Sequence, residues 1–119
     1  MANRIHSTLF LVSNIKNTSD FYKKLGFKVK QKGNSARIIF GDYRLAFMEG
    51  EKDHETTNKA KNGYGIFIYF EVEDLDKFTK DLEARQLKLE NEPISQPWGK
   101  KELKIHDPDG YRLIFFENL

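Results

Sequence analysis

The feature that most constrains this chain is a strand-like segment that it carries twice. The first copy reads Gly41-Asp-Tyr-Arg-Leu-Ala-Phe-Met-Glu49, and the second reads Asp109-Gly-Tyr-Arg-Leu-Ile-Phe-Phe-Glu117. Tyr-Arg-Leu, the phenylalanine and the final glutamate keep the same spacing in both copies. Because a segment repeated in this way usually belongs to a larger repeated unit, we expect one structural unit that is formed twice.

The segments around the two copies follow the same order. In the first half we expect a strand at 4–12, a helix capped by Asn17 or Thr18, and strands at 27–32 and 36–40 before the first copy. In the second half we expect a strand at 66–72, a helix capped by Asp74, short strands at 87–90 and 102–106, and then the second copy. Residues 91–99 contain two prolines and are expected to form a loop. The order predicts a βαβββ unit made twice.

This pattern predicts an α+β protein in which two βαβββ modules pair. A small sheet with one helix cannot bury both of its apolar faces, so we expect 1–119 to form a single domain. The predicted modules are 1–50 and 65–119. Residues 51–64 are polar, charged and rich in glycine and are expected to form a linker.

Charge and composition exclude several classes of function. The net charge is +2 with both signs interspersed, which predicts no nucleic-acid partner. There is no cysteine, so neither disulfides nor thiolate chemistry can occur. The longest apolar run, Leu9–Val12, is far too short for a membrane span or a signal peptide. We therefore expect a cytoplasmic protein without a membrane partner.

Period-two alternation assigns the strand residues to two faces. Ile66, Ile68, Phe70 and Val72 are all apolar, which predicts a face covered by a helix, whereas Phe67, Tyr69 and Glu71 form a mixed face. In the two repeated strands, Arg44 with Ala46 corresponds to Arg112 with Ile114. An apolar floor with a few polar groups is typical of a small-molecule pocket, although these arginines could instead only cover the sheet with their stems.

Several short motifs resemble the vicinal oxygen chelate superfamily, which holds glyoxalases, bleomycin-resistance proteins, fosfomycin-resistance enzymes and extradiol dioxygenases. The motifs are Val12-Ser-Asn-Ile15, Phe21-Tyr22, Leu25-Gly26-Phe27, Trp98-Gly99 and Asp107-Pro-Asp-Gly-Tyr111. The resemblance implies a curled mixed sheet in each module, helices outside, and a concave cavity facing the repeated strands. It also implies a homodimer, in which modules are sometimes exchanged between chains.

The enzymes of that superfamily place His or Glu at four positions of the cavity. On this sequence the resemblance maps those positions to Ser7, Ala46, Phe67 and Ile114. These side chains cannot form an imidazole and carboxylate site for a divalent metal, so we expect neither a metal nor another cofactor. A one-residue slip in strand register would bring His6 and Glu49 to this face instead, but it would also expose the apolar set meant for the helix.

The candidate ligand-binding residues combine the mixed strand faces with the mapped positions. They are Ser7, Leu9, Arg44, Ala46, Met48, Phe67, Tyr69, Glu71, Trp98, Arg112, Ile114 and Phe116. Trp98 could stack on a flat ligand or could serve in packing, and Glu71 is a candidate for acid–base work or a solvated strand end. The three histidines, His6, His54 and His106, are scattered. His106 beside Asp107 could form a base–orienter pair or cap a turn.

The sequence favours binding over catalysis. We expect metal-independent binding of a small organic ligand, anionic or aromatic, in a manner similar to sequestration by bleomycin-resistance proteins or to sensing. An alternative is a glyoxalase-like lyase or a dioxygenase whose metal site uses His6, Glu49, Glu71 or His106. A third is an interaction module in which Phe67, Trp98, Ile114 and Phe116 close the concave face.

Overall fold

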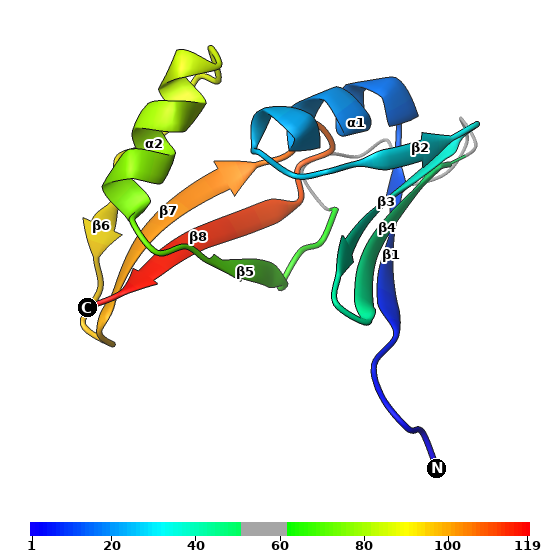
Figure 1. Ribbon diagram of the computed structural model, residues 1–119, viewed down its shortest axis with the longest axis horizontal. Coiled ribbons are helices and arrows are strands. Elements are labelled where there is room, and N and C mark those ends of the chain that lie inside the picture. Colours follow the sequence, from blue (N-terminus) through cyan, green and yellow to red (C-terminus); the bar gives the residue numbers. More distant parts are fainter. Residues whose placement is uncertain (51–61) are drawn as a thin grey trace. The chain divides into compact units, whose positions relative to one another are not determined.

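The computed structural model of the protein describes residues 1–50 and 62–119 (Figure 1). The chain divides into two compact units, Met1–Lys59 and Ala60–Leu119, which we call the first and the second module. His54 and most of the predicted linker 51–64 lie outside the described residues, and Asn62 to Gly65 form a turn. The pairing of the two modules into a single domain stays a prediction.

The first module is a four-stranded mixed sheet with one helix. Its elements are β1 (Ser7–Val12), α1 (Ile15–Lys24), β2 (Lys30–Lys32), β3 (Ser35–Phe40) and β4 (Tyr43–Glu49). The strand order is β1-β4-β3-β2, in which β1 runs parallel to β4 and the other neighbours are antiparallel. The parallel pair is possible because α1 provides the crossover between β1 and the rest of the sheet.

The second module repeats this topology. Its elements are β5 (Phe67–Glu71), α2 (Leu75–Ala84), β6 (Ile94–Ser95), β7 (Lys100–His106) and β8 (Arg112–Asn118). The strand order is β5-β8-β7-β6, with β5 parallel to β8. The predicted α+β class and the doubled βαβββ unit are therefore confirmed.

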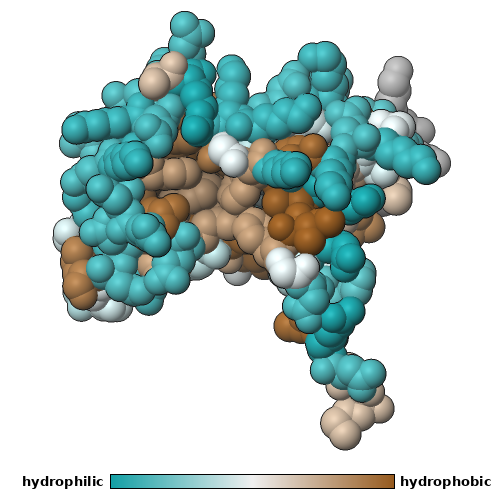
Figure 2. Space-filling view, in the orientation of Figure 1, coloured by the Kyte–Doolittle hydropathy of each residue, from teal (hydrophilic) through white to brown (hydrophobic). Residues whose placement is uncertain are grey.

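Each helix lies on one face of its own sheet (Figure 1). In both modules aromatic rings pack between the helix and the sheet. In the first module the Phe10 and Phe47 rings stack at 5.3 Å between centroids, and Tyr22 of α1 lies 4.7 Å from Phe47. In the second module Phe115 stacks on Phe70 at 4.9 Å and on Phe78 of α2 at 4.6 Å. The outer surfaces of both helices are hydrophilic (Figure 2), which is typical of amphipathic helices covering a sheet.

The same capping arrangement fixes the start of each helix. The Asn14 side chain accepts a hydrogen bond from the Asn17 amide (2.9 Å), and Asp74 accepts one from the Lys77 amide (3.0 Å). The predicted cap of the second helix, Asp74, is confirmed. The predicted cap of the first helix is wrong, because α1 begins at Ile15 and is capped by Asn14 rather than by Asn17 or Thr18. The reason is that Asn14 has an extended backbone and a side-chain oxygen that reaches the Asn17 amide, so the helix starts directly after it.

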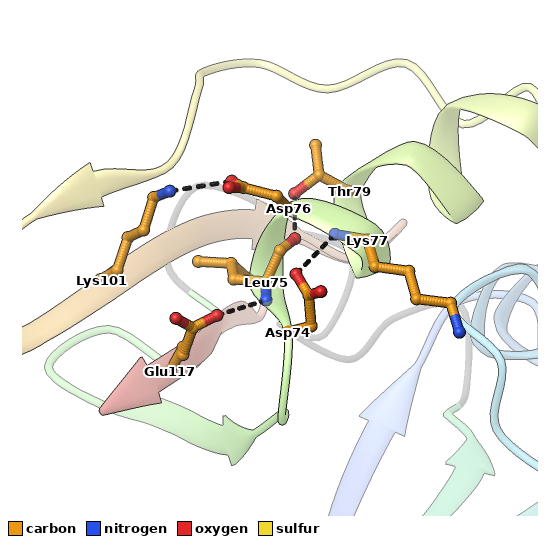
Figure 3. Close-up of polar contacts among 7 residues, drawn as sticks. All are labelled: Asp74, Leu75, Asp76, Lys77, Thr79, Lys101 and Glu117. Atoms are coloured by element: carbon orange, nitrogen blue, oxygen red, sulfur yellow. Dashed lines mark hydrogen bonds and ion pairs between the residues drawn. The ribbon is translucent and has the colours of Figure 1, made fainter. Parts of the chain in front are cut away.

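The glutamate that ends each repeated strand holds the adjacent helix. Glu49 accepts a hydrogen bond from the Ile15 amide (3.0 Å), and Glu117 accepts one from the Leu75 amide (2.7 Å), as Figure 3 shows for the second module. A carboxylate at this position satisfies an amide that has no partner inside the helix and interacts favourably with the helix dipole. We call each glutamate with its helix amide a helix clasp.

Two further expectations about the strands are wrong. Residues 87–90 form no strand, and the short strand β6 lies instead at Ile94–Ser95, inside the predicted loop 91–99. Tertiary pairing explains the shift, because Ile94 lies opposite Glu102 of β7 between the two prolines. Ile66 precedes β5 and is 61% exposed rather than covered by a helix.

Among the described residues, no helix is long and apolar enough to cross a membrane.

Candidate ligand-binding site

One face of the second sheet carries the side chains of the candidate site. The register places Phe67 and Tyr69 of β5 beside Arg112 and Ile114 of β8, and Lys104 of β7 on the other side of Ile114. Paired residues in a sheet share a face. The opposite face, with Leu103, Leu113 and Phe115, is buried under α2. The predicted division of β5 and β8 into a helix face and an open face is confirmed within this module.

A pocket of about 450 Å³ opens on this face. Its lining residues come from all four strands of the second module and from the loops around β6. They are Phe67, Tyr69, Asn91, Ile94, Gln96, Trp98, Glu102, Lys104 and Ile114. The volume lies in the range of pockets for small organic molecules.

Three aromatic side chains flank the pocket, and each of them is about half exposed. Phe67, Tyr69 and Trp98 are 46%, 47% and 58% exposed, whereas Ile114 between the strands is buried and forms the floor. Exposed ring faces of this kind can stack on a planar molecule. The arrangement therefore offers flat apolar contact surface rather than a closed core.

Trp98 is held by its loop and by Glu102. The loop turns tightly, because the Gln96 amide donates to the Lys100 carbonyl (2.7 Å) and Gly99 has a φ of +85°. The indole Nε1 donates a hydrogen bond of 2.9 Å to Glu102 Oε2. This bond gives the indole a defined position, although the side chain is 58% exposed. Of the two readings of Trp98, stacking on a ligand fits this exposure better than packing does.

Glu102 is the buried charged group of the site. It is only 7% exposed, and it faces the pocket from β7. Partial burial, followed by the charge and the hydrogen bonding of the Glu102 carboxylate, raises the pKa of the Tyr69 phenol. The phenol therefore stays protonated and available as a hydrogen-bond donor over a wider pH range.

The basic groups on this face rest on aromatic rings. The Lys104 ammonium lies 5.7 Å from the centroid of Phe67. The Arg112 guanidinium lies 4.8 Å from the same centroid, and its Nη2 donates a hydrogen bond of 2.6 Å to the Gly63 carbonyl. Arg112 is not among the pocket-lining residues, so its contacts agree with the reading in which the arginine covers the sheet.

The candidate ligand-binding residues of the second module divide into those that line the pocket and those that do not. Four of them, Phe67, Tyr69, Trp98 and Ile114, line the pocket. Glu71, Arg112 and Phe116 share the face but lie outside the lining. Glu71 is exposed and accepts a hydrogen bond from the Asn118 side chain (2.7 Å), which agrees with a solvated strand end.

The candidates of the first module share one face of their own sheet. Ser7 lies opposite Arg44, Leu9 opposite Ala46, and Leu11 opposite Met48. Leu9 and Met48 are 55% and 43% exposed. This face corresponds by its position in the repeat to the pocket face of the second module. A ligand-binding role for Ser7, Leu9, Arg44, Ala46 and Met48 stays a prediction.

The residues at the mapped metal positions do not fit a metal ion. Ser7, Ala46, Phe67 and Ile114 supply no imidazole or carboxylate, and the register of both sheets keeps these residues on the open faces. Within 1–50 and 62–119, no three His, Asp or Glu side chains come together in a group that could hold an ion. Glu49 remains on the helix side, where it forms its clasp, so the register slip does not occur.

Two of the three histidines, His6 and His106, contact other polar side chains. His6 precedes β1, and its Nε2 lies 3.0 Å from Arg44 Nη1, so its ring contacts an open-face residue rather than the helix. The change follows from its place outside the strand, where alternation no longer sets the side chain's direction. His106 Nδ1 lies 2.9 Å from Glu90 Oε2, while Asp107 accepts the Asp109 amide instead. The base–orienter pair of His106 with Asp107 is therefore wrong.

Sequence reasoning missed five lining residues, which are Asn91, Ile94, Gln96, Glu102 and Lys104. For two of them the sequence did carry a signal, the alternation of polar and apolar residues along β7. Glu102 and Lys104 alternate with the buried Leu103 and Ile105, and this alternation places both on the face of Ile114 once β7 pairs with β8. The other three depend on the position of β6, which only the tertiary pairing reveals.

Comparisons with known proteins agree with this architecture. The sequence model of the family described as "Glyoxalase/Bleomycin resistance protein/Dioxygenase superfamily" matches residues 4–115. An uncharacterized protein of Bacillus subtilis (strain 168), YraH, is 25% identical over an alignment 120 residues long, and the match covers 92% of this chain and 94% of that protein.

Solved structures with the same fold include proteins of this family. A glyoxalase/bleomycin resistance protein/dioxygenase from Nocardioides has a TM-score of 0.77 at 19% identity, covering 100% of this chain and 85% of that chain. A bleomycin-binding protein, solved in complex with bleomycin, has a TM-score of 0.70 at 19% identity, covering 99% and 100%. At these identities the likeness shows the fold.

Proposed function

Because the chain belongs to the glyoxalase/bleomycin resistance protein/dioxygenase superfamily, we propose that it binds a small planar organic molecule in the pocket of the second module. The family and the structural neighbours support ligand binding or a glyoxalase-like role in general. Fold alone does not decide between these roles, so the choice rests on the side chains of the site.

The observation that carries the proposal is the set of three half-exposed aromatic rings around one pocket. Phe67, Tyr69 and Trp98 offer ring faces, and Ile114 provides an apolar floor. Asn91, Gln96 and Glu102 add hydrogen-bonding groups to the lining. An apolar pocket with a few convergent polar groups suits recognition of a flat ligand.

We favour binding without a metal, as sequestration or sensing, over metal-dependent chemistry. The mapped positions Ser7, Ala46, Phe67 and Ile114 carry no ligating group of the kind that such a metal needs. Of the side chains proposed for a non-standard site, Glu49 caps a helix and His106 contacts Glu90. We also propose, from the family resemblance and the composition, that the protein is a cytoplasmic homodimer.

Trp98 provides a direct test, because it is the only tryptophan of the chain. A panel of small aromatic compounds is titrated while Trp98 fluorescence and the thermal midpoint are followed, with and without a chelator. Stacking should quench or shift the emission, and binding to the native state should raise the midpoint. Both effects should be insensitive to the chelator.

Matched variants locate the binding surface. Trp98→Ala should lose the midpoint shift, whereas Tyr64→Ala, which removes a more exposed ring of the same module outside the pocket lining, should keep it. A panel that leaves both fluorescence and midpoint unchanged would contradict the proposal. Stoichiometric metal in the purified protein, with binding abolished by the chelator, would favour the glyoxalase-like or dioxygenase alternative.

A further inference from the structure

We propose that the pocket selects a planar ligand with a cationic group rich in N–H donors, and that the Glu102 carboxylate binds this group. The inference rests on the proposed function and names the chemical class of its ligand. It reverses the expectation of an anionic ligand, which rested on the arginines of the repeated strands. Those arginines are not part of the pocket, whereas a carboxylate is.

The first argument is the burial of Glu102 without a basic partner. Its exposed fraction is 7%. Among residues 1–50 and 62–119, no Lys, Arg or His side chain forms an ion pair with it. Removing a carboxylate from water is costly unless an opposite charge or several hydrogen bonds compensate. A cation in the pocket would supply that charge in a place where little water screens it.

The second argument is the spare hydrogen-bonding capacity of this carboxylate. Trp98 donates one hydrogen bond to Oε2, and the protonated Tyr69 phenol is a second neutral donor beside it. An ionised carboxylate has about four acceptor positions. Two neutral donors orient the group but leave its charge in place. A planar cation with parallel N–H groups can therefore pair with it as arginine does, through two hydrogen bonds.

The third argument concerns Lys104, the cation that lines the same pocket. Lys104 lies two residues from Glu102 on one face of β7, yet its ammonium rests over the Phe67 ring. It is only partly buried, so water already solvates much of its charge. An anionic ligand would therefore gain less from Lys104 than a cation gains from Glu102. The ring faces of Tyr69 and Trp98 also attract cations rather than anions.

The test compares three probes of one shape and different charge: benzamidine, benzamide and benzoate. Each is titrated into the wild-type protein, and binding is followed by Trp98 fluorescence and by isothermal titration calorimetry. We expect benzamidine, which is a cation at neutral pH, to bind about tenfold more tightly than benzamide, with benzoate weakest. Benzoate binding at least as tightly as benzamidine would overturn the inference.

Two variants assign the preference to Glu102. Glu102→Gln keeps the shape and an oxygen that accepts the Trp98 hydrogen bond but removes the charge. We expect it to lose about tenfold in benzamidine affinity and to bind benzamide within about twofold of the wild type. Glu92→Gln removes the same charge from an exposed residue of the adjacent loop, outside the lining, and should leave all three affinities unchanged.

The outcomes separate this inference from the proposed function. Equal binding of the three probes, or a Glu102→Gln variant that keeps the benzamidine preference, would overturn the inference and leave aromatic binding in place. Absence of binding by all three probes, together with the failure of the aromatic panel, would overturn both. The order of the three affinities in the wild type decides the inference even if the variant is poorly folded by circular dichroism.

Discussion

The two modules share a scaffold and differ on their open faces. The aromatic stack, the helix cap and the helix clasp recur: Phe47 corresponds to Phe115, Asn14 to Asp74, and Glu49 to Glu117. These groups lie between the sheet and its helix, where packing and unpaired amides leave few alternatives. The two modules therefore share the contacts between sheet and helix, which are the contacts that form the fold.

On the open faces the corresponding residues differ in kind. Leu9 and Tyr69 lie opposite Ala46 and Ile114, respectively, in equivalent strand pairs. Ser35 lies opposite Met48, whereas Glu102 lies opposite Phe116. An open face is not constrained by helix packing, so its chemistry can change without loss of the fold. The second module uses this freedom to combine aromatic rings with a buried carboxylate.

The largest expected effect tests the shared scaffold. Phe47→Ala and Phe115→Ala remove a buried ring, 1% exposed in both cases, that packs against one ring of a strand and one ring of a helix. Each should lower the free energy of unfolding by about 3–5 kcal/mol, measured by urea denaturation. Phe116→Ala, next to Phe115 on the open face and partly exposed, should cost clearly less. Equal costs at 115 and 116 would contradict the division into faces.

A second prediction sharpens the contrast on the open face. Tyr69→Leu gives the second module the residue that the first module has at the equivalent position. Because Tyr69 contributes a ring face and a donor to the pocket, we expect about tenfold weaker binding of benzamidine by calorimetry. The urea midpoint should change little, since the side chain is half exposed. Tyr64→Leu makes the same change at an exposed tyrosine of this module outside the pocket lining, and as the control it should leave that affinity unchanged.

A third prediction concerns the helix clasps. Glu117→Gln and Glu49→Gln keep an oxygen for the helix amide but remove the charge near the helix N-terminus. Each should lower the free energy of unfolding by about 0.5–1 kcal/mol in a urea titration. Glu73→Gln removes an exposed charge without a clasp, and a comparable loss there would show that the clasp is not the cause.

The smallest effect concerns an exposed ion pair of the second module. Lys101 lies 2.8 Å from Asp76, and its hydrogen bond and charge lower the pKa of the Asp76 carboxyl below its ordinary value of 3.8 (Figure 3). A lowered pKa stabilises the folded state above the ordinary value, and this contribution is lost as the pH falls through the folded-state pKa. Lys101→Met should raise the Asp76 pKa, measured by NMR titration. An unchanged pKa would show that the pair does not persist in solution.

Much of the fold could be predicted from residues whose role is local. The doubled unit is evident from the repeated segments Tyr43 to Glu49 and Tyr111 to Glu117. The strand faces follow from alternation, in which Phe67 and Tyr69 point to one side of the sheet and Ile68 and Phe70 to the other. The cap of α1 was predicted at Asn17 or Thr18 rather than at Asn14, because several neighbouring residues here are of the types that favour caps and turns. The strand β6 was misplaced because two residues between prolines have no periodicity of their own.

The sequence by itself therefore determined the repeated βαβββ unit, the faces of the strands and the lack of ligating side chains at the mapped metal positions. Only the tertiary structure decided which polar groups meet in the pocket. Glu102, Trp98 and Tyr69 come from a strand, a loop and a second strand that is not adjacent to the first. Alternation along one strand assigns a face, but the choice of neighbours on that face depends on the pairing and register of several strands, which no single segment encodes.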